Sequence, residues 1–285
     1  MKYYRKMKRW FLFLLAGGLF CTVGCTASVK VIYPSRSYVT EKRHLGDVKT
    51  IMLVSSVDVE YYQTKGKPYA EIFASDNVLP EVLVEESGGT LTVGYKRSVS
   101  FRGENRCKVK VYAPSATVFE TNASGDISIP GGLHTNRAVI LHVNASGDID
   151  LSSVVCQSLK AEVNASGDIQ IQIVKCDRAD GMVNASGDLN IKRLDCTRAN
   201  LEVNASGDCE VEGRCRTVRL MNNASGDIDA ENLRAVDVTA ENNGSGDISC
   251  HASESLDAVN RGSGDISYAG NPKQVRKEGK HIDRD

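Results

Sequence analysis

The stretch Val163-Asn164-Ala165-Ser166-Gly167-Asp168-Ile169 decides the fold, because close copies of it recur along more than half of the chain. Among 285 residues the tripeptide Ser-Gly-Asp occurs eight times, and its serines are 22, 20, 20, 20, 19, 20 and 18 residues apart. A period of about 20 residues is typical of a solenoid, in which each repeat buries its apolar side against its neighbours. The chain is therefore expected to form a shaft of stacked coils. The serines are Ser124, Ser146, Ser166, Ser186, Ser206, Ser225, Ser245 and Ser263.

Each repeat carries three short segments in which apolar and polar residues alternate. In the coil that starts at Ser166 these are Ile169-Gln170-Ile171, Val174-Lys175-Cys176 and residues 179–183. Alternation with a period of two indicates a strand with one buried side. Three such strands per coil, repeated in the next coil, predict an all-β protein. The fold expected is a right-handed parallel β-helix with coils of about 20 residues.

The turn between coils is expected to depend on its small and polar residues. Glycine would supply a positive φ without steric cost, and Asn, Ser and Asp would satisfy backbone groups locally. The asparagines of the turn could also bond to one another, amide to amide, along the axis; they are Asn122, Asn144, Asn164, Asn184, Asn204, Asn223 and Asn243. Toward the C-terminus the preceding Val becomes Asn222, Asn242 and Asn260, so the core there should be more polar.

A leucine-rich repeat is the rival fold, because its period also lies in the twenties. Its pattern needs L-x-x-L-x-L-x-x-N/C-x-L and a helical half. In this chain the Asn follows Val directly, and no part of the repeat has a period of 3.6 residues. The sequence therefore favours the β-helix.

The N-terminal residues have the pattern of an export signal. Lys2 to Arg9 is basic, Trp10 to Phe20 is apolar, and small residues precede Cys25. This order is typical of a secretory signal peptide, and the apolar run is short for a membrane span. Val23-Gly24-Cys25 resembles the lipobox of bacterial lipoproteins, in which the cysteine is acylated after cleavage. We therefore expect Cys25 to be a lipid anchor; a plain signal peptide or an uncleaved anchor is the alternative.

These patterns divide the chain into five parts. They are a lipoprotein signal peptide (1–24), a tether (25–45), irregular N-terminal β coils (46–115), the regular β-helix (116–270) and a C-terminal tail (271–285). Cleavage before Cys25 removes five basic residues, which changes the formal net charge from −1 to −6. No basic patch of the kind that nucleic-acid binding requires is present, so nucleic acid is not an expected partner.

Three pieces of the sequence resemble the family named Putative auto-transporter adhesin, head GIN domain. They are Val57-Asp58-Val59-Glu60 with Ser75-Asp76-Asn77 and Gly89-Thr90-Leu91-Thr92-Val93, the serial Asn-Ala-Ser-Gly-Asp-Ile turns, and Tyr268-Ala269-Gly270-Asn271-Pro272. The resemblance covers roughly residues 46–275. It implies a β-helical surface module of the kind found in secreted or lipid-anchored Bacteroidetes proteins. The family name implies adhesion, without a ligand and without catalytic residues.

One aspartate per repeat forms the most conspicuous candidate site. Carboxylates one strand spacing apart repel each other, so calcium between the coils is one interpretation. The nine-residue G-G-x-G-x-D repeat of calcium-binding β-rolls is absent, however. We therefore favour a structural role, with each Asp accepting hydrogen bonds in its own turn and remaining solvated. No metal is expected; the residues are Asp126, Asp148, Asp168, Asp188, Asp208, Asp227, Asp247 and Asp265.

Seven cysteines follow Cys25, an odd number, so at least one has no internal disulfide partner. Cys209 and Cys250 occupy slots that are mostly aliphatic in other repeats and are expected to be buried core residues. Cys156, Cys176, Cys196 and Cys215 form one column, close enough along the axis for disulfides. Stacked strands hold the Cβ directions parallel, which is poor disulfide geometry, so buried thiols are favoured. No His joins the column to suggest a metal.

The function expected is that of a lipid-anchored envelope protein whose β-helical head is a structural or adhesion module. Its partners would be the membrane, through the lipid, and a surface polysaccharide or envelope protein; no cofactor is expected. A β-helical polysaccharide-active enzyme is the first alternative, but the repeats offer like residues where a catalytic cleft needs unlike ones. A periplasmic scaffold is the second. Surface export of Bacteroidetes lipoproteins often relates to acidic residues just after the lipidated Cys, and Thr26 to Lys30 has none. This absence argues against surface display, and both the periplasmic and the surface-facing side of the outer membrane stay open.

Overall fold

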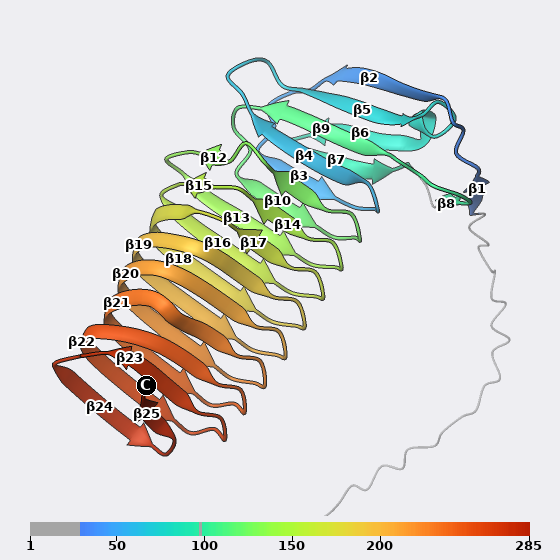
Figure 1. The fold of residues 1–285 in the computed structure, drawn as a ribbon. Coiled ribbons are helices and arrows are strands. Elements are labelled where there is room, and N and C mark those ends of the chain that lie inside the picture. Colours follow the sequence, from blue (N-terminus) through green and yellow to red (C-terminus); the bar gives the residue numbers. More distant parts are fainter. Residues whose placement is uncertain (1–28, 97–98) are drawn as a thin grey trace, which may run out of the picture.

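The computed structural model describes residues 29–96 and 99–285, which form a shaft of stacked coils with a β-rich head at one end (Figure 1). Within this part of the chain the helical element is a short 3-10 turn, η1 (Leu79–Glu81). The remaining elements are strands, and the shaft strands pair in parallel. The predicted parallel β-helix is confirmed, and the leucine-rich repeat, which needs a helical half in every coil, is wrong.

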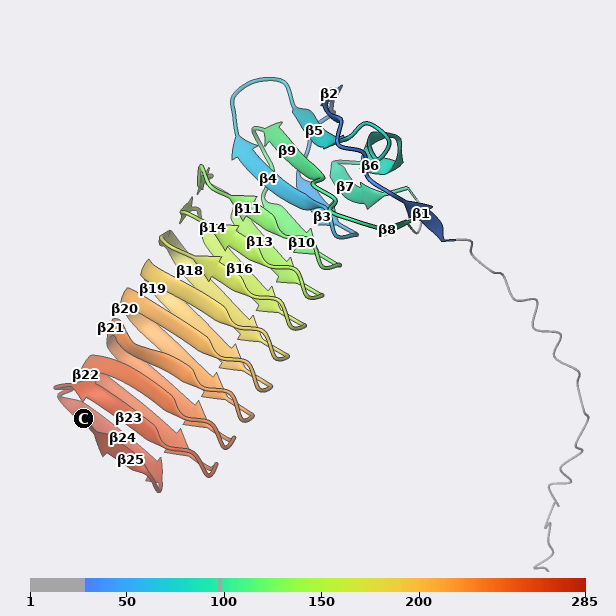
Figure 2. The ribbon, with the colours of Figure 1, turned by 45° about the vertical axis from the view of Figure 1, so that its right-hand side comes forward.

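The first regular coils consist of separate short strands in strict register. Ile149 lies beside Ile169, and Leu151 lies beside Ile171, so each apolar column of the sequence becomes a column in space. Figure 2 shows these coils stacked below the head. Their strands are β10 (Val118–Thr121), β11 (Ile127–Ile129), β12 (Leu133–His134), β13 (Ala138–Val143), β14 (Ile149–Leu151), β15 (Val154–Val155), β16 (Ser158–Val163) and β17 (Ile169–Ile171).

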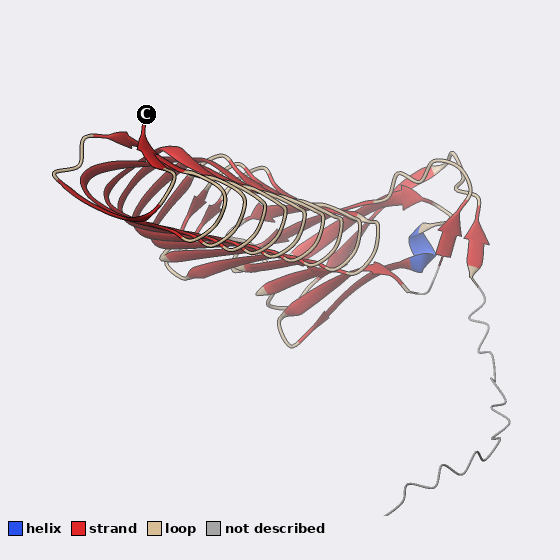
Figure 3. Cartoon of the chain, turned by 90° about the horizontal axis from the view of Figure 1, so that it is seen from below, coloured by secondary structure: helices blue, strands red, loops and turns tan. Residues whose placement is uncertain are grey.

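In the later coils the strands run on around the corner of the shaft. Each of these long strands pairs with its counterpart in the next coil over most of its length. Figure 3 shows the turns of successive coils lying one behind another in a single row. The strands are β18 (Val174–Val183), β19 (Leu189–Val203), β20 (Cys209–Asn222), β21 (Ile228–Asn242), β22 (Ile248–Asn260) and β23 (Ile266–Gly270).

The core lies inside the coils and consists of the apolar columns. Ile127, Ile149, Ile169 and Leu189 follow one another in one column and have no exposed surface. Burying a side chain of this size is worth roughly 1.5–3 kcal/mol relative to leaving it exposed. Because every coil adds to the same columns, the core grows with the number of repeats and needs no second layer.

At the N-terminal end the coils are not in sequence order. β3 (Thr50–Leu53) and β4 (Asp58–Gln63) lie against β10 and β11, and β7 (Thr90–Tyr95) and β9 (Lys108–Ala113) form the next layer outward. Three further strands then pair antiparallel and cover this end: β2 (Tyr38–His44), β5 (Tyr69–Ser75) and β6 (Val82–Ser87). The head therefore closes one end of the shaft, as irregular terminal coils are expected to do.

Two segments expected to lie outside the fold belong to it. The expected tether contains β1 (Lys30–Ile32), which pairs with β8 (Val99–Phe101), as well as β2. The expected tail contains β24 (Gln274–Gly279) and β25 (Ile282–Arg284), which add a last, partial coil. Charged residues hid β2 and β24 from the sequence pattern, because terminal strands need less apolar surface and use charge to block further pairing. The expected signal peptide and Cys25 lie outside the described residues.

None of the helical structure within residues 29–96 and 99–285 has the length and apolar character needed to cross a membrane.

Candidate functional site

The turn glycines are required for a different reason from the one predicted. Positive φ angles occur at seven glycines of the described chain, and none of these belongs to a Ser-Gly-Asp turn. Instead, a Cβ added at Gly187 would lie 2.1 Å from the carbonyl oxygen of Gly167, in the preceding coil. At Gly147 the corresponding distance, to Gly125, is 2.0 Å. Glycine is therefore needed because the turns of neighbouring coils approach more closely than any side chain allows.

The aspartates form a ladder of hydrogen bonds between coils. The N–H of Asp168 donates to Oδ1 of Asp148 at 2.8 Å, and the N–H of Asp188 donates to Oδ1 of Asp168 at the same distance. The bond repeats at every later turn through Asp265. The expectation that each carboxylate accepts hydrogen bonds in its own turn is therefore wrong, because each one from Asp126 to Asp247 accepts from the next coil. The ladder begins at Asp58, which accepts from Asp126 at 3.3 Å.

The sequence pattern missed Asp58 because no Ser-Gly precedes it. The signal that could have found it is Val57-Asp58-Val59, in which Asp58 and Val59 take the places of Asp126 and Ile127 in the next coil. The turn of the first coil is thus built from another sequence but presents the same carboxylate. The ladder therefore spans the head as well as the eight repeats.

The ladder makes one side of the shaft acidic. Burial and the charges of Asp126 and Asp168 raise the pKa of Asp148, and the N–H of Asp168 only partly offsets them. Burial, followed by the charge of Asp148, also raises the pKa of Asp150. A hollow of about 330 Å³ lies on the same side, lined by residues that include Asp188, Asp208 and Asp227. Within the described residues, no three His, Cys, Asp or Glu side chains are grouped so as to hold a metal ion.

The predicted amide ladder is confirmed. The side-chain amide of Asn164 donates to Oδ1 of Asn144 at 2.9 Å, and Asn184 donates to Asn164 at 2.8 Å. The same bond joins each remaining neighbouring pair from Asn122 to Asn243, with distances of 2.8 to 3.0 Å. Two parallel ladders, one of amides and one of carboxylates, therefore hold the turns in register on either side of the glycines.

The core becomes polar toward the C-terminal end, as predicted, and its polar groups are paired. Asn222 is fully buried; its amide donates to the carbonyl of Gly226 at 2.7 Å, and its Oδ1 accepts from the N–H of Ala224 at 3.1 Å. Asn242 and Asn260 make the same pair of contacts in their own turns. A buried amide is tolerated where both its donor and its acceptor are used.

The described cysteines are all free thiols. Cys209 and Cys250 are buried in the core, as expected, and burial raises the pKa of each thiol to about 12. In the expected column Cys196 lies beside both Cys176 and Cys215. The thiol of Cys196 donates to Sγ of Cys215 at 3.3 Å. The column is therefore a stack of thiols, with Cys196 its most exposed member.

A second axial row, which the sequence pattern did not reveal, runs along the side formed by β10, β13 and β16. Carboxylates occupy every second coil of this row, so they are about two strand spacings apart and repel each other less than neighbouring aspartates do. His142 lies between two of them, with Nε2 3.0 Å from Glu162 and Nδ1 3.4 Å from Glu120. In axial order the row is Glu120, His142, Glu162, Met182, Glu202, Met221, Glu241, Val259 and Glu278.

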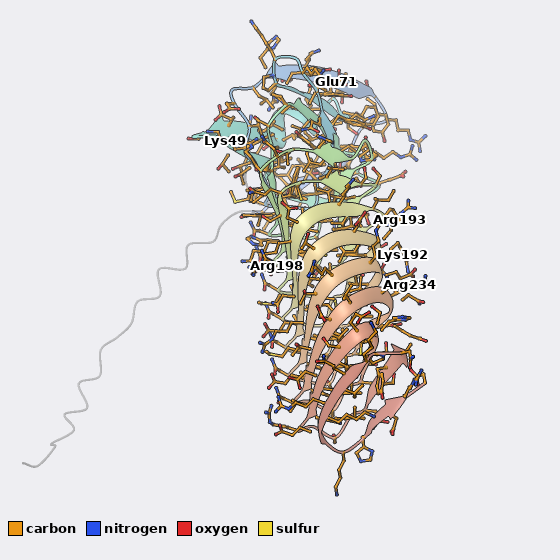
Figure 4. All side chains as sticks on the ribbon, turned by 90° about the vertical axis from the view of Figure 1, so that its left-hand side faces the viewer. Lys49, Glu71, Lys192, Arg193, Arg198 and Arg234 are labelled. Carbon is orange, nitrogen blue, oxygen red and sulfur yellow. The ribbon has the colours of Figure 1, made fainter. Side chains whose placement is uncertain are left out.

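The remaining side of the shaft, where the long strands bend, carries cations along its edges. Figure 4 looks at this side and shows Arg198 at one edge and Lys192, Arg193 and Arg234 at the other. Lys192 forms an ion pair with Glu210 at 2.8 Å. Acidic side chains accompany these cations, since Glu210 also lines the hollow beside the aspartate ladder and Arg198 lies near Asp180 and Glu202.

Two further surface hollows within the described residues lie on the head and on the shaft. One of about 340 Å³ lies on the head over Thr40, Glu71, Phe73, Lys108 and Lys110. Another, of about 440 Å³, lies on the shaft between Arg178, Arg198 and Arg219 and their polar neighbours. Such sites suit contact with an extended or flat partner better than enclosure of a small molecule, which usually needs a concave pocket.

A model of the family described as Putative auto-transporter adhesin, head GIN domain matches residues 47–211 and 174–272. The chain belongs to this family. The match includes the head coils from residue 47 and all eight Ser-Gly-Asp turns of the shaft. The resemblance noted in the sequence is thereby confirmed. No curated protein matches the chain.

Solved structures of other proteins share this fold. A putative lipid binding protein from Parabacteroides distasonis is 25% identical, with a TM-score of 0.66; the match covers 90% of this chain and 100% of that one. A putative adhesin from the same species is 19% identical, with a TM-score of 0.69 and coverage of 90% and 99%. A putative adhesin from Parabacteroides merdae is 20% identical, with a TM-score of 0.64 and coverage of 90% and 100%.

Proposed function

We propose that the protein is a lipid-anchored, adhesion-like module of the bacterial cell envelope. Cys25 would hold the mature chain in the outer membrane, and the shaft would carry binding surfaces away from it. The observation that supports this most strongly is the shaft itself. Its coils are tied together by continuous Asn and Asp ladders, which repeat the same polar groups along the turn side of the shaft.

A shaft of this kind is suited to contact rather than to catalysis. A catalytic site needs unlike groups held within reach of one substrate atom. The described ladders instead bring like groups together: Asp with Asp, Asn with Asn and Cys with Cys. The family name and two of the similar structures also point to adhesion. The partner we favour is an envelope polysaccharide or an envelope protein, because open hollows fit extended surfaces.

The N-terminal position of the head supports the anchor. Cys25 precedes the first described residue, Val29, by only four positions. The head would therefore lie at the membrane, and the C-terminal coils would point away from it. A periplasmic scaffold differs from a surface adhesin only in the side of the outer membrane that the shaft occupies.

Protease treatment of intact cells distinguishes these two locations. With an epitope after Asp285, a surface adhesin should lose the epitope on intact cells, because the far end of the shaft is outside. A periplasmic scaffold should lose it only after the outer membrane is opened. A Cys25→Ala variant tests the anchor in the same strain, since it should not incorporate a clickable fatty acid. Two results together would contradict the adhesin proposal. The epitope would be protected from protease on intact cells, and a strain from which this protein is deleted would attach to surfaces as well as the parent strain does.

A further inference from the structure

The N-terminal edge of the head carries an apolar stripe that faces outward. Val29, Val31 and Tyr33 are 53%, 50% and 71% exposed, and they alternate along β1 and the two residues that flank it. Alternate residues of a strand point to the same side of the sheet. Three large apolar side chains therefore lie in one exposed line, and all three belong to the strongly exposed hydrophobic residues of the described chain.

The opposite side of β1 is occupied by the head. Ile32 is 5% exposed and belongs to the core, and Lys30 forms an ion pair with Glu81. One side of the strand thus contacts the head through buried Ile32 and the Lys30–Glu81 ion pair, and the other side has no packed residue. Burial of the bare side against a partner outside the described residues would therefore be favourable.

The stripe is held rigidly and has a cation beside it. β1 pairs in parallel with β8, which places Val31 beside Ser100. The N–H of Arg102 bonds to the carbonyl of Ile32 at 2.9 Å, so Arg102 continues β8 on the side of the stripe. Asn77 fixes the chain just after β1, since its amide donates to the carbonyl of Tyr33 at 2.8 Å. Apolar residues beside an exposed Tyr and Arg are the composition of surfaces that lie at a membrane–water interface.

The covalent distance to Cys25 identifies the partner. Val29 follows Cys25 by four positions, and a fully extended chain covers at most about 3.6 Å per residue. The stripe therefore cannot begin more than roughly 14 Å from an acylated Cys25. That distance is about half the hydrocarbon thickness of a bilayer. An anchored head would thus have its bare apolar stripe at the level of the lipid headgroups.

We infer that the β1–β8 edge is a membrane-docking surface, with Val29, Val31 and Tyr33 inserted among the lipid headgroups beside the acyl chains of Cys25. This inference rests on the proposed anchor at Cys25. A protein contact beside the acyl chains strengthens attachment to the membrane. The docking surface also fixes the direction of the shaft, because it holds the head against the bilayer where a flexible tether would let it swing.

Tryptophan at the stripe reports its depth directly. The chain has one Trp, Trp10, which lies in the expected signal peptide. The substitution Trp10→Phe removes the fluorescence of Trp10 from any uncleaved protein. In that background Tyr33→Trp places the reporter on the stripe. Val275→Trp is the matched control, because Val275 is 46% exposed on β24, at the far end of the shaft (Figure 1). Each protein, purified from bacterial envelopes, is mixed with phosphatidylethanolamine and phosphatidylglycerol vesicles that contain a brominated lipid.

Docking predicts a blue-shifted emission and strong quenching for the Tyr33→Trp protein, and neither for the Val275→Trp protein. Adding Val31→Asp should reduce the quenching of the stripe reporter, whereas Glu278→Asp at the far end should leave it unchanged. Equal emission of the two reporter proteins in vesicles would overturn the inference. The stripe would then be covered by something other than lipid, such as a second copy of the chain or its N-terminal segment. Mass spectrometry of the same samples tests the anchor separately. Quenching of the stripe reporter without acylation would support docking and contradict the anchor.

Discussion

The backbone N–H of Asp208 donates a hydrogen bond of 2.8 Å to Oδ1 of Asp188, its counterpart in the preceding coil. The carboxylate is exposed to solvent, as expected, but it acts as an acceptor between repeats rather than within its own turn. A charged acceptor forms a stronger hydrogen bond than a neutral one, and this opposes the repulsion between stacked aspartates. The hydrogen bond explains why all eight repeats have Asp after Ser-Gly in the turn, although neighbouring carboxylates repel each other.

Substitutions at Asp188 should separate the effect of its hydrogen-bond acceptor on stability from the effect of its negative charge. Asp188→Asn keeps an oxygen for the N–H of Asp208 and removes one of the stacked charges, so stability should stay equal or rise. Asp188→Ala removes the acceptor and should lower the free energy of unfolding by about 0.5–1.5 kcal/mol. Urea unfolding of both variants measures the difference. If Asn were as destabilising as Ala, the charge itself, and not the bond, would hold the ladder together.

The pH dependence of stability should contain a contribution from Asp148. Burial raises the pKa of Asp148 above its ordinary value of 3.8, so the folded protein holds this proton more strongly than the unfolded chain does. The stabilising contribution is complete below pH 3.8 and is lost as the pH rises through the folded-state pKa. Asp148→Asn keeps the acceptor but cannot titrate, so it should gain stability relative to wild type as the pH rises toward neutrality. A difference independent of pH, measured by chemical unfolding, would show that this carboxyl is not perturbed.

The close approach of turns makes Gly187 intolerant of any side chain. Gly187→Ala should cost about 1–3 kcal/mol, since its Cβ would meet the carbonyl oxygen of Gly167, and backbone cannot move aside within a stack. Gly66→Ala is the matched control, because no atom lies within 4 Å of its added Cβ. It should change stability by less than about 0.5 kcal/mol. Thermal unfolding of the two variants tests this, and equal melting temperatures would argue against the packing described.

Cys209 should behave as an aliphatic core residue. Cys209→Val should fold with nearly unchanged stability, because Leu189 and Ile228 fill the same column in the adjacent coils. Cys209→Asp should prevent folding, since it buries an unpaired charge. In the native protein a bulky thiol reagent should modify Cys196, which is partly exposed, well before Cys209. Modification of Cys209 at the rate of Cys196 would refute its burial.

The regular part of the fold was predictable because the same sequence pattern recurs in every coil. Each Ile of the column that contains Ile149 and Ile169 follows a Ser-Gly-Asp turn, so period, strand and register could be read from alternation alone. The amide ladder followed from the same repetition, since one Asn per coil, stacked in register, can bond only along the axis.

The head could not be read in the same way. Its layers follow a spatial order in which β3 and β4 lie between β10 and β11 on one side and β7 and β9 on the other, and no local pattern encodes that order. β2 is rich in charged residues because it is an edge strand, so it resembled a tether. The membrane-docking stripe depends on which side of β1 is bare, and that depends on the packing of Ile32.

The chemical state of the mature N-terminus tests the central claim most directly. Intact mass spectrometry of the protein purified from bacterial membranes should show a chain that begins at Cys25 and carries acyl groups. The same preparation from a Cys25→Ala strain should lack both the cleavage and the acyl mass. A mature chain that begins at another residue, or an unmodified Cys25, would contradict the proposal of a lipid-anchored envelope module.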